Sequence, residues 1–212
     1  MKISVSVGSA YYDGSNFDDL VAYVQAAERL GVDTVWSAEA WGMDAVASLG
    51  YLAAVTDTIR IGSGIMQISA RTPATTAMTA LSLAQISGDR FSLGLGVSGP
   101  QVVEGLHGDS FAHPLGRLRE YVEIVRMGLR GERLRYEGEH YVLPRPGGEG
   151  KALRPSIPPR PHLPIHLATL GPRSLELTGE LADGWLGTSF IPEHAEVMLD
   201  PIRRGAERAG RS

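Results

Sequence analysis

One stretch of the sequence, Ile61 to Gln101, constrains the fold more than any other part of the chain. It contains two apolar runs separated by an Ala/Met/Leu segment with helical spacing. Neither run alternates cleanly between polar and apolar residues, which is typical of parallel strands covered on both faces. Thr72 suits the N-cap of the helix, and Pro73 suits its first turn because the missing N–H needs no partner there. The stretch therefore predicts a strand–helix–strand unit of a parallel α/β sheet.

Both predicted strands of this unit end in small residues. Gly62-Ser63-Gly64 ends the first strand, and the second ends in Gly94, Gly96, Ser98 and Gly99. Ligands bind at the carboxyl ends of strands in α/β folds, and glycine lets backbone amides approach a flat or anionic ligand. The alternative is that these glycines only relieve crowding where strands curve into a barrel. Two such ends in succession favour a ligand site. The run Gly94–Gly99 superficially resembles a dinucleotide fingerprint, but no long helix follows it directly, so a Rossmann fold is rejected.

The same strand and helix pattern repeats along the chain. The first strand ends in a polar turn over residues 9–16, and helices are expected over Phe17–Leu30, Ala45–Thr56, Pro114–Leu129, Gly171–Leu181 and Pro192–Ala209. Strands begin near Lys2, Thr34, Arg60, Phe91, Pro164 and Gly184. We expect one domain over residues 1–212, an α/β fold of the (β/α)8 TIM-barrel type with about six βα units.

A barrel of this type closes with eight strands, so two units are unaccounted for. Either the chain is a shortened or truncated member of the fold, or the remaining strands come from elsewhere. Six strands left open expose an edge, which predicts instability or pairing with another chain.

Residues 131–163 interrupt the repeat. Two short strands are expected within Arg133–Pro144, around a Glu-Gly-Glu turn, and the following residues to His162 are rich in Pro, Gly and Arg. Long irregular insertions in a compact domain are usually functional or mobile. We expect this segment to lie over the ligand cleft as a lid.

Composition excludes several classes of function. The chain is 43% hydrophobic with a net charge of -4, so it lacks the excess of basic residues that nucleic acid requires. It contains no cysteine, which excludes disulfides and thiolate chemistry. No apolar run is long enough to span a membrane, and a cytoplasmic location is expected. No His or carboxylate pair has metal-ligand spacing, and no serine lies in a nucleophile elbow.

A few residues outside the glycine-rich ends are candidates for binding or catalysis. Glu39 and Trp41 follow the second strand, where a carboxylate and an indole are placed to orient a planar heterocycle. The alternative is a solvated loop acid and a packing residue. His107 and His113 are candidates to face the cleft, although a histidine between loop glycines is more often a packing residue.

The helix start at Gly171-Pro172-Arg173-Ser174 has the features of a phosphate site. Its free N–H groups and dipole attract an anion, and Arg173 adds a positive charge. Hydroxyls of Thr188 and Ser189, after the next strand, are placed to join it. The alternative is that the helix simply begins with proline, as many do.

Several motifs in order along the chain resemble the bacterial luciferase-like monooxygenase superfamily. They are similar in particular to its branch that uses the deazaflavin coenzyme F420 and includes methylenetetrahydromethanopterin reductase. The motifs are Ala38–Ala45, Gly62–Ile65, Ala70–Pro73, Gly88–Gly96, Ser98–Gly105, Gly171-Pro172 and Ala182–Trp185.

The resemblance implies a (β/α)8 barrel that holds the deazaflavin ring at the carboxyl ends of its strands, and a homodimer. It also implies a non-proline cis peptide at Gly64-Ile65, in a bulge that supports the ring from behind, and a cofactor phosphate near Gly171 and Thr188. The cofactor-binding residues that follow from it are Glu39, Trp41, Ser63, Gly64, Ile65, Gln67, Gly96, Ser98, Gly99, Gln101, Val102, Leu170, Gly171, Pro172, Arg173 and Thr188.

The activity implied by the resemblance is hydride transfer between C5 of the deazaflavin and a small organic substrate. Some members carry an acid–base histidine in an Asp-His pair after the second strand, where this chain has Glu39-Ala40. Glu39 and His107 are therefore the candidates for a general acid or base. Two alternatives remain open: a monooxygenase that uses reduced FMN, and a non-catalytic truncated barrel that acts as a binding or scaffold protein.

Overall fold

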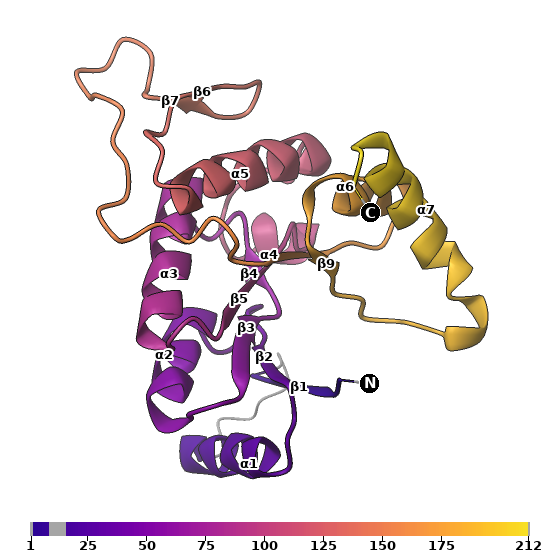
Figure 1. Cartoon of the computed structure of the whole chain (residues 1–212). Helices are drawn as coiled ribbons and strands as arrows, with labels where there is room; N and C mark the ends of the chain where they lie inside the picture. The colour runs from indigo at the N-terminus through magenta and orange to yellow at the C-terminus, as the bar shows by residue number, and fades with distance from the viewer. Residues whose placement is uncertain (1, 9–15, 212) are drawn as a thin grey trace.

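The computed structural model describes residues 2–8 and 16–211, in which parallel strands form one curled sheet with helices along its outer side (Figure 1). The strand order is β1-β2-β3-β5-β8-β9, and β4 pairs with the second half of β5. These strands are β1 Ser4–Val7, β2 Thr34–Ser37, β3 Arg60–Ser63, β4 Met66–Gln67, β5 Phe91–Gly96, β8 Ile165–Ala168 and β9 Gly184–Trp185. The curled parallel sheet with about six βα units is confirmed, with the short β4 as an addition. The expected turn at 9–16 falls almost wholly outside the described residues.

The helices begin and end close to the predicted positions. They are α1 Phe17–Arg29, α2 Ala45–Val55, α3 Pro73–Ile86, α4 Pro100–Val103, α5 Pro114–Leu129, α6 Pro172–Leu181 and α7 Glu196–Arg208, with a 3-10 turn, η1, at Pro192–His194. The Thr72 side chain accepts a hydrogen bond from the N–H of Thr75 at 3.2 Å, and Pro73 opens α3. Asp44 caps α2 in the same way. The local cap signals in the sequence therefore fixed where these helices start.

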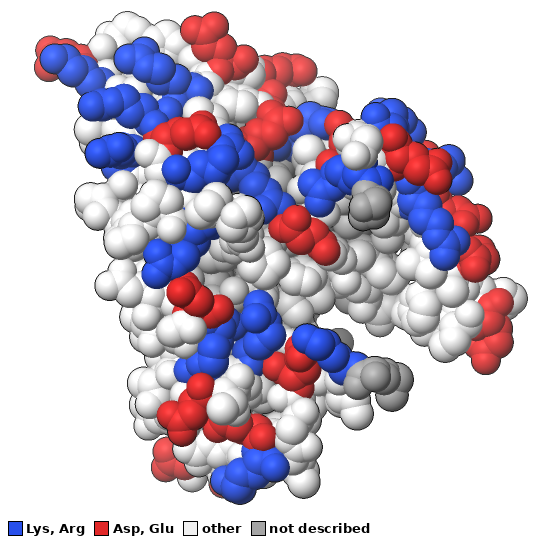
Figure 2. Space-filling model, in the orientation of Figure 1, with Lys and Arg blue, Asp and Glu red and all other residues white. Residues whose placement is uncertain are grey.

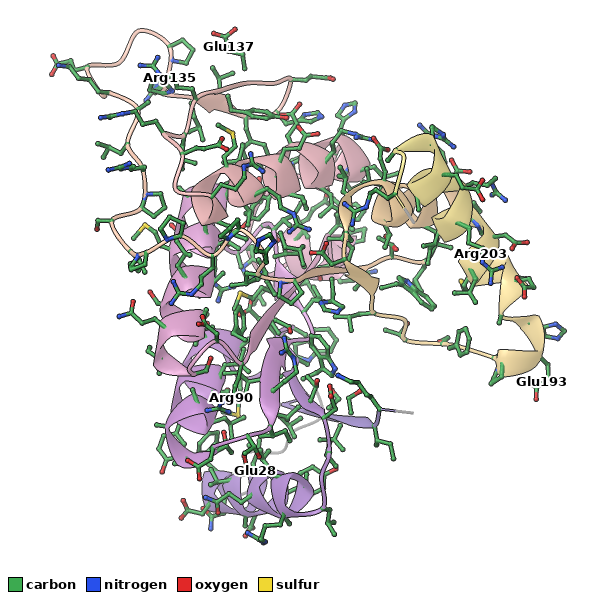
Figure 3. The ribbon with its side chains drawn as sticks, viewed as in Figure 1. Glu28, Arg90, Arg135, Glu137, Glu193 and Arg203 are labelled. Atoms are coloured by element: carbon green, nitrogen blue, oxygen red, sulfur yellow. The ribbon has the colours of Figure 1, made fainter. Side chains whose placement is uncertain are left out.

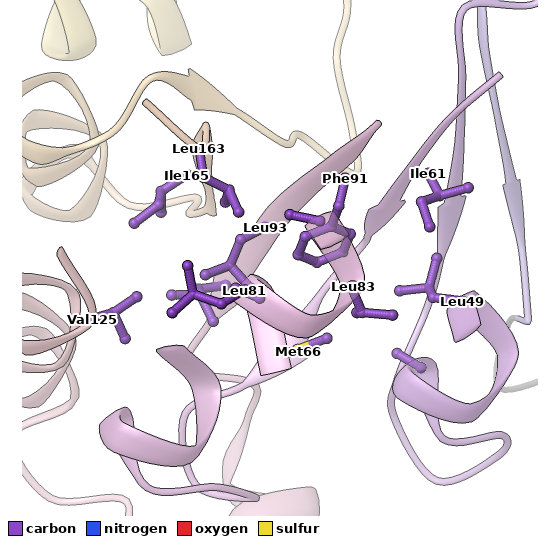
Figure 4. Packing of buried hydrophobic residues seen from close by; sticks show 14 of the residues in the cluster. Leu49, Ile61, Met66, Leu81, Leu83, Phe91, Leu93, Val125, Leu163 and Ile165 are labelled. Carbon is purple, nitrogen blue, oxygen red and sulfur yellow. The ribbon is translucent and has the colours of Figure 1, made fainter. Parts of the chain in front are cut away.

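The main core lies between the outer face of the sheet and the helices (Figure 4). Ile61, Leu93 and Ile165 come from three strands and are fully buried against helical residues such as Leu49 and Val125. Each such side chain contributes about 1.5–3 kcal/mol of transfer free energy on burial. The apolar runs that first suggested parallel strands supply this core.

Two large side chains occupy the inner face of the sheet. Trp36 from β2 and His166 from β8 meet edge to face, with ring centroids 5.1 Å apart. Glycine opposite each ring makes the room: a Cβ at Gly62 would lie 2.4 Å from the Trp36 ring, and one at Gly184 would lie 2.3 Å from the His166 ring. Some strand glycines thus do relieve crowding on the inner face, as the alternative interpretation held.

Glu28 and Arg90 hold the turn that enters β3 (Figure 3). One oxygen of Glu28 accepts hydrogen bonds from the backbone N–H groups of Asp57, Thr58 and Ile59 at 2.6–2.9 Å. Arg90 donates to backbone carbonyls at the end of α2 and of Ile59. These bonds satisfy buried backbone groups that the turn would otherwise leave unpaired.

The insertion 131–163 packs on α5. Its two short strands, β6 Tyr136–Glu137 and β7 Val142–Leu143, pair antiparallel as predicted. Glu120 of α5 accepts hydrogen bonds at 2.8–2.9 Å from the backbone N–H groups of Glu139, His140 and Tyr141 in the hairpin turn. The segment expected to cover the cleft is thus fixed to α5, and its role as a lid stays a prediction.

Helices α6 and α7 cross with almost no space between their backbones. A Cβ at Gly179 would lie 1.9 Å from the carbonyl oxygen of Ile202, and one at Gly205 would lie 1.9 Å from that of Glu176. Glu176 also pairs with Arg204 and Arg208 across the crossing. The C-terminal helix is therefore held mainly by α6.

On the face shown in Figure 2, positive and negative side chains are interspersed, and basic atoms gather over the insertion, which contains Arg133, Arg135, Arg145, Lys151 and Arg154. Among the described residues, none of the helices has the length and apolar character that crossing a membrane would require.

Candidate functional site

The carboxyl ends of the parallel strands bring together loops that are far apart in the sequence. Residues 38–44 follow β2, residues 64–65 link β3 to β4, residues 97–99 follow β5, and residues 169–171 follow β8. Because the strands are parallel, these loops all lie at one end of the sheet. Half of the residues predicted to bind the cofactor are in them.

The link between β3 and β4 forms a platform against β5. The peptide bond between Gly64 and Ile65 is cis, at the position that the family resemblance implied. The Ile65 side chain lies on Gly96, where an added Cβ would be 2.9 Å from its Cδ1 atom. This platform is partly exposed at Gly64 and Ile65.

Ser63 and Gly94 hold the two strands under this platform together. The Ser63 hydroxyl accepts from the N–H of Gly94 at 2.8 Å and donates to its carbonyl at 2.9 Å, and it is fully buried. A Cβ at Gly94 would overlap the carbonyl oxygen of Ser63 at 1.9 Å. Both residues are therefore engaged in joining β3 to β5, and the Ser63 hydroxyl has its bonds already made.

Glu39 forms a buried ion pair that the sequence did not predict. Arg71 Nη1 and Nη2 donate to the two carboxylate oxygens of Glu39 at 2.6 and 2.7 Å, and the two side chains are only 13% and 9% exposed. Hydrogen bonding to Glu39 raises the pKa of Arg71, against the opposing effect of burial. The carboxylate also accepts weaker bonds from the N–H groups of Ala45 and Gln67. Its acceptor sites are thus directed to the protein, which makes it a poor general base.

Gln67 ties the loop after β2 to β4. Its Nε2 donates to the carbonyl of Ala40 at 3.0 Å and, at 3.4 Å, to that of Glu39. Its Oε1 atom is buried without a partner among the described residues. Trp41, on the same loop, is 61% exposed and is free to cover a ligand.

The loop after β5 turns sharply before the short helix α4. Ser98 adopts a left-handed conformation with φ 59°, and Gly99 precedes Pro100 as the N-cap. A Cβ at Gly99 would meet only the Gln101 side chain, at 3.7 Å. Ser98 and Gln101 are exposed, whereas Val102 is buried beneath them.

The start of α6 is open. Gly171, Pro172 and Arg173 are exposed, no side chain caps the helix, and a Cβ at Gly171 would meet only the Ser174 hydroxyl at 3.7 Å. Leu170 and Thr188 are exposed as well. Arg173 also lines a groove of about 310 Å³ between α5, α6 and α7, together with Arg119, Glu176 and Arg208.

The two candidate histidines of the loops differ in their surroundings. His107 is exposed on the segment that follows α4. His113 stacks on His140 of the insertion hairpin with centroids 5.6 Å apart, and it adopts φ 52° as the N-cap of α5. His113 therefore contacts the insertion.

The sequence did not single out Arg71, Trp36 or His166 as site residues. The signal for Arg71 was a charged residue directly before the Thr72-Pro73 helix start, in the segment that links the predicted strand to that helix. The role of His166 was harder to predict, because a single histidine in a short strand belongs to no recognisable sequence motif. Burial lowers the pKa of His166, and its Nδ1 is buried without a partner in the described part of the chain.

Within residues 2–8 and 16–211, no three His, Cys, Asp or Glu side chains are grouped so that they could hold a metal ion.

The fold and the site define a parallel α/β protein of the barrel type with its ligand loops at the carboxyl ends of the strands. Residues 1–212 match the family model for luciferase-like monooxygenase, and the chain belongs to this family.

Relatives of known name share the sequence over nearly the whole chain. It is 43% identical over 216 residues to a Mycobacterium tuberculosis protein named "Putative coenzyme F420-dependent oxidoreductase", covering 99% of this chain and 62% of that protein. It is 34% identical to 5,10-methylenetetrahydromethanopterin reductase of Methanolobus tindarius, covering 89% of this chain and 56% of that one. The chain thus spans about 60% of the length of these relatives.

Solved structures share the fold over the full chain. The coenzyme F420-dependent tetrahydromethanopterin reductase of Methanopyrus kandleri superposes with a TM-score of 0.84 at 23% identity, covering 62% of that chain. An F420-dependent secondary alcohol dehydrogenase, in complex with an F420-acetone adduct, gives a TM-score of 0.84 at 20% identity and 66% coverage of that chain. These comparisons establish the luciferase-like fold.

Proposed function

We propose that this chain binds coenzyme F420 at the carboxyl ends of its strands and belongs to an F420-dependent oxidoreductase that acts on a small organic substrate. The observation that carries the proposal is the 43% identity, over 99% of the chain, to a protein named for F420-dependent oxidation and reduction. The fold alone does not select the cofactor, because a neighbour with a TM-score of 0.80 is a monooxygenase in complex with FMN.

The strand-end loops fit a flat cofactor with an anionic tail. In this proposal the Gly64-Ile65 link, which lies on Gly96, and the exposed Trp41 supply apolar surface to the ring. The Glu39 carboxylate is paired with Arg71, which lessens its repulsion of a negative ligand.

The tail phosphate fits the start of α6. Gly171 has open space beside it, and the first turn of the helix carries N–H groups without intrahelical partners. Thr188 supplies a hydroxyl and Arg173 a positive charge in this proposal. Gln67, Gly99, Gln101, Val102, Leu170 and Pro172 complete the proposed set.

When bound, coenzyme F420 supplies hydride exchange at C5, and this chain supplies binding, orientation and shielding from water. Ile65 would support the ring from one side, as the family resemblance implies. Glu39 holds its loop through Arg71 and moves no proton. His107 remains the proposed residue for proton transfer, since its exposed ring lies on the loop after α4.

A reduced-FMN monooxygenase is the second candidate, favoured by the family description itself. A binding experiment separates the two: the purified protein is titrated with F420 and, separately, with FMN, each followed by fluorescence. Saturation by F420 at concentrations where FMN gives no change supports the proposal. Saturation by FMN alone assigns the chain to the monooxygenases, and binding of neither cofactor supports the non-catalytic alternative.

A further inference from the structure

We propose that Arg71 is a positioning residue that fixes the loop 38–44 over the strand ends, so that the wall carrying Trp41 is formed before the cofactor arrives. The inference rests on the proposed function for its ligand, but its structural part is testable without one. Arg71 lies between β4 and α3 and reaches the loop after β2 from the side.

Arg71 joins both ends of this loop. Its guanidinium donates to Glu39 at the beginning of the loop through two bonds and to Asp44 at the end through Nη2, at 2.8 Å. Asp44 uses its other oxygen to cap α2, by accepting from the N–H of Ala47 at 2.7 Å. A single planar cation therefore sets the distance between the two ends of the loop, which only the fork geometry of arginine allows.

Arg71 is itself held in place from behind. The Tyr121 hydroxyl donates to the carbonyl of Arg71 at 3.1 Å and shares a short hydrogen bond of 2.6 Å with Thr76. Tyr121 is fully buried in α5, and Thr76 is fully buried in the first turn of α3. The cation is thus anchored to the rigid helical layer, and the loop is anchored to the cation.

Burial distinguishes this pair from the others on the protein. The pair Arg119–Glu180 has the same two-bond geometry, with both distances at 2.6 Å, but its side chains are 39% and 29% exposed. Removal of one partner from a largely buried pair leaves a charge without compensation, whereas exposed pairs contribute little. Arg119 joins α5 to α6, which makes it a matched control remote from the loop.

The first test measures the loop without ligand. Hydrogen exchange of residues 38–45 is followed by mass spectrometry in the unaltered protein and in Arg71→Ala, Arg71→Lys and Arg119→Ala. We expect exchange in Arg71→Ala to be about tenfold faster, as for the loss of a buried partner. Arg71→Lys should give a smaller increase because it keeps the charge but loses the fork, and Arg119→Ala should give none. Unchanged exchange in Arg71→Ala overturns the proposal.

The second test uses coenzyme F420 and a double-mutant cycle with Glu39→Gln. If Arg71 acts through Glu39, each single change should weaken F420 binding by about tenfold and the double change by no more than either alone. Additive losses would instead indicate that Arg71 or Glu39 contacts the cofactor directly, which contradicts the inference. If the unaltered protein does not bind F420, the proposed function fails, while the exchange experiment still decides whether Arg71 holds the loop.

Discussion

At the scale of single residues, two carboxylates organise turns of this protein. Glu28 and Glu120 each accept three backbone N–H groups from a turn distant in sequence. Burial raises the pKa of Glu120, but the N–H donors of His140, Glu139 and Tyr141 outweigh that effect and hold the pKa below its ordinary value. The insertion hairpin therefore depends on the ionised form of one side chain.

We expect Glu120→Ala to lower the free energy of unfolding by about 2 kcal/mol at pH 7, because three amide donors lose their acceptor. The folded pKa lies below the unfolded value of about 4.3, so the contribution is complete above that pH and is lost as the pH falls through the folded pKa. Urea unfolding at pH 7 and pH 3 checks this. Glu137→Ala, on the same hairpin but exposed, is the control. An equal effect of Glu120→Ala at both pH values would contradict the explanation.

The glycines of the sheet do not all have the same role. At Gly94 a Cβ would overlap the backbone oxygen of Ser63, whereas at Gly50, inside α2, nothing lies within 4 Å. We expect Gly94→Ala to destabilise the fold by about 3 kcal/mol and Gly50→Ala to stabilise it by about 0.5–1 kcal/mol. Thermal unfolding of the two variants measures the difference in their stabilities. If Gly94→Ala unfolds at the same temperature as the unaltered protein, β3 and β5 can move apart without loss of stability, and the explanation is wrong.

The sequence predicted which segments carry the candidate site, since strand ends follow from periodicity. It did not predict that the carboxylate of Glu39 would form an ion pair with Arg71. These residues are 32 positions apart, and no local pattern pairs charges across two loops. The roles of Ser63 and Gly94 were missed for the same reason, because close approach of two backbones is a property of packing.

At the scale of elements, the crossing of α6 and α7 depends on two glycines, although glycine is unfavourable inside a helix. Gly179 and Gly205 each face a backbone carbonyl of the other helix. The sequence predicted α6 from its Gly-Pro start and a further helix over Pro192–Ala209, of which the structure forms α7 over Glu196–Arg208. It did not predict that they pack on each other, since the glycines gave no signal beyond lowered propensity.

We expect Gly205→Ala to separate α7 from α6, because its Cβ would lie 1.9 Å from the carbonyl oxygen of Glu176. Limited proteolysis should then cleave within α7 several-fold faster, since a detached helix opens locally. Arg203→Ala, on the exposed side of the same helix, should leave the cleavage rate unchanged. Equal protection of both variants would mean that α7 is held by contacts other than this crossing.

At the scale of the whole molecule, the sheet of the described residues is open between β1 and β9. Exposed apolar side chains lie near these two strands in the sequence: Ile3 is 57% exposed before β1, and Ile191 is 58% exposed in the segment that follows β9. The six-strand count, and hence the open edge, was predicted from the sequence because each βα unit has its own start and stop signals. The sequence did not predict what covers the edge strands β1 and β9, because no residue pattern in it specifies a partner chain.

We propose that this chain self-associates, in keeping with the expected homodimer. Unpaired strand edges and exposed apolar side chains favour association. Sedimentation velocity over a range of concentrations should show a dimer that weakens in Ile191→Lys and in Ile3→Lys, whereas Glu137→Lys, on the insertion, should not alter it. A monomer at every concentration would contradict this expectation.

The claim that the strand ends hold an F420 phosphate at α6 is tested most directly by Gly171→Asp. The position has open space, and a carboxylate at a helix N-terminus is favourable, so the variant should unfold no earlier than the unaltered protein. Gly150→Asp, also in open space but on the insertion, is the matched control.

The measurement is the dissociation constant for F420 of the three proteins, by fluorescence titration. We expect Gly171→Asp to weaken binding by about 100-fold, because it places a negative charge where the phosphate binds in our proposal. Gly150→Asp should bind F420 as the unaltered protein does. Unchanged F420 affinity in Gly171→Asp would contradict the placement of the cofactor at this end of the sheet.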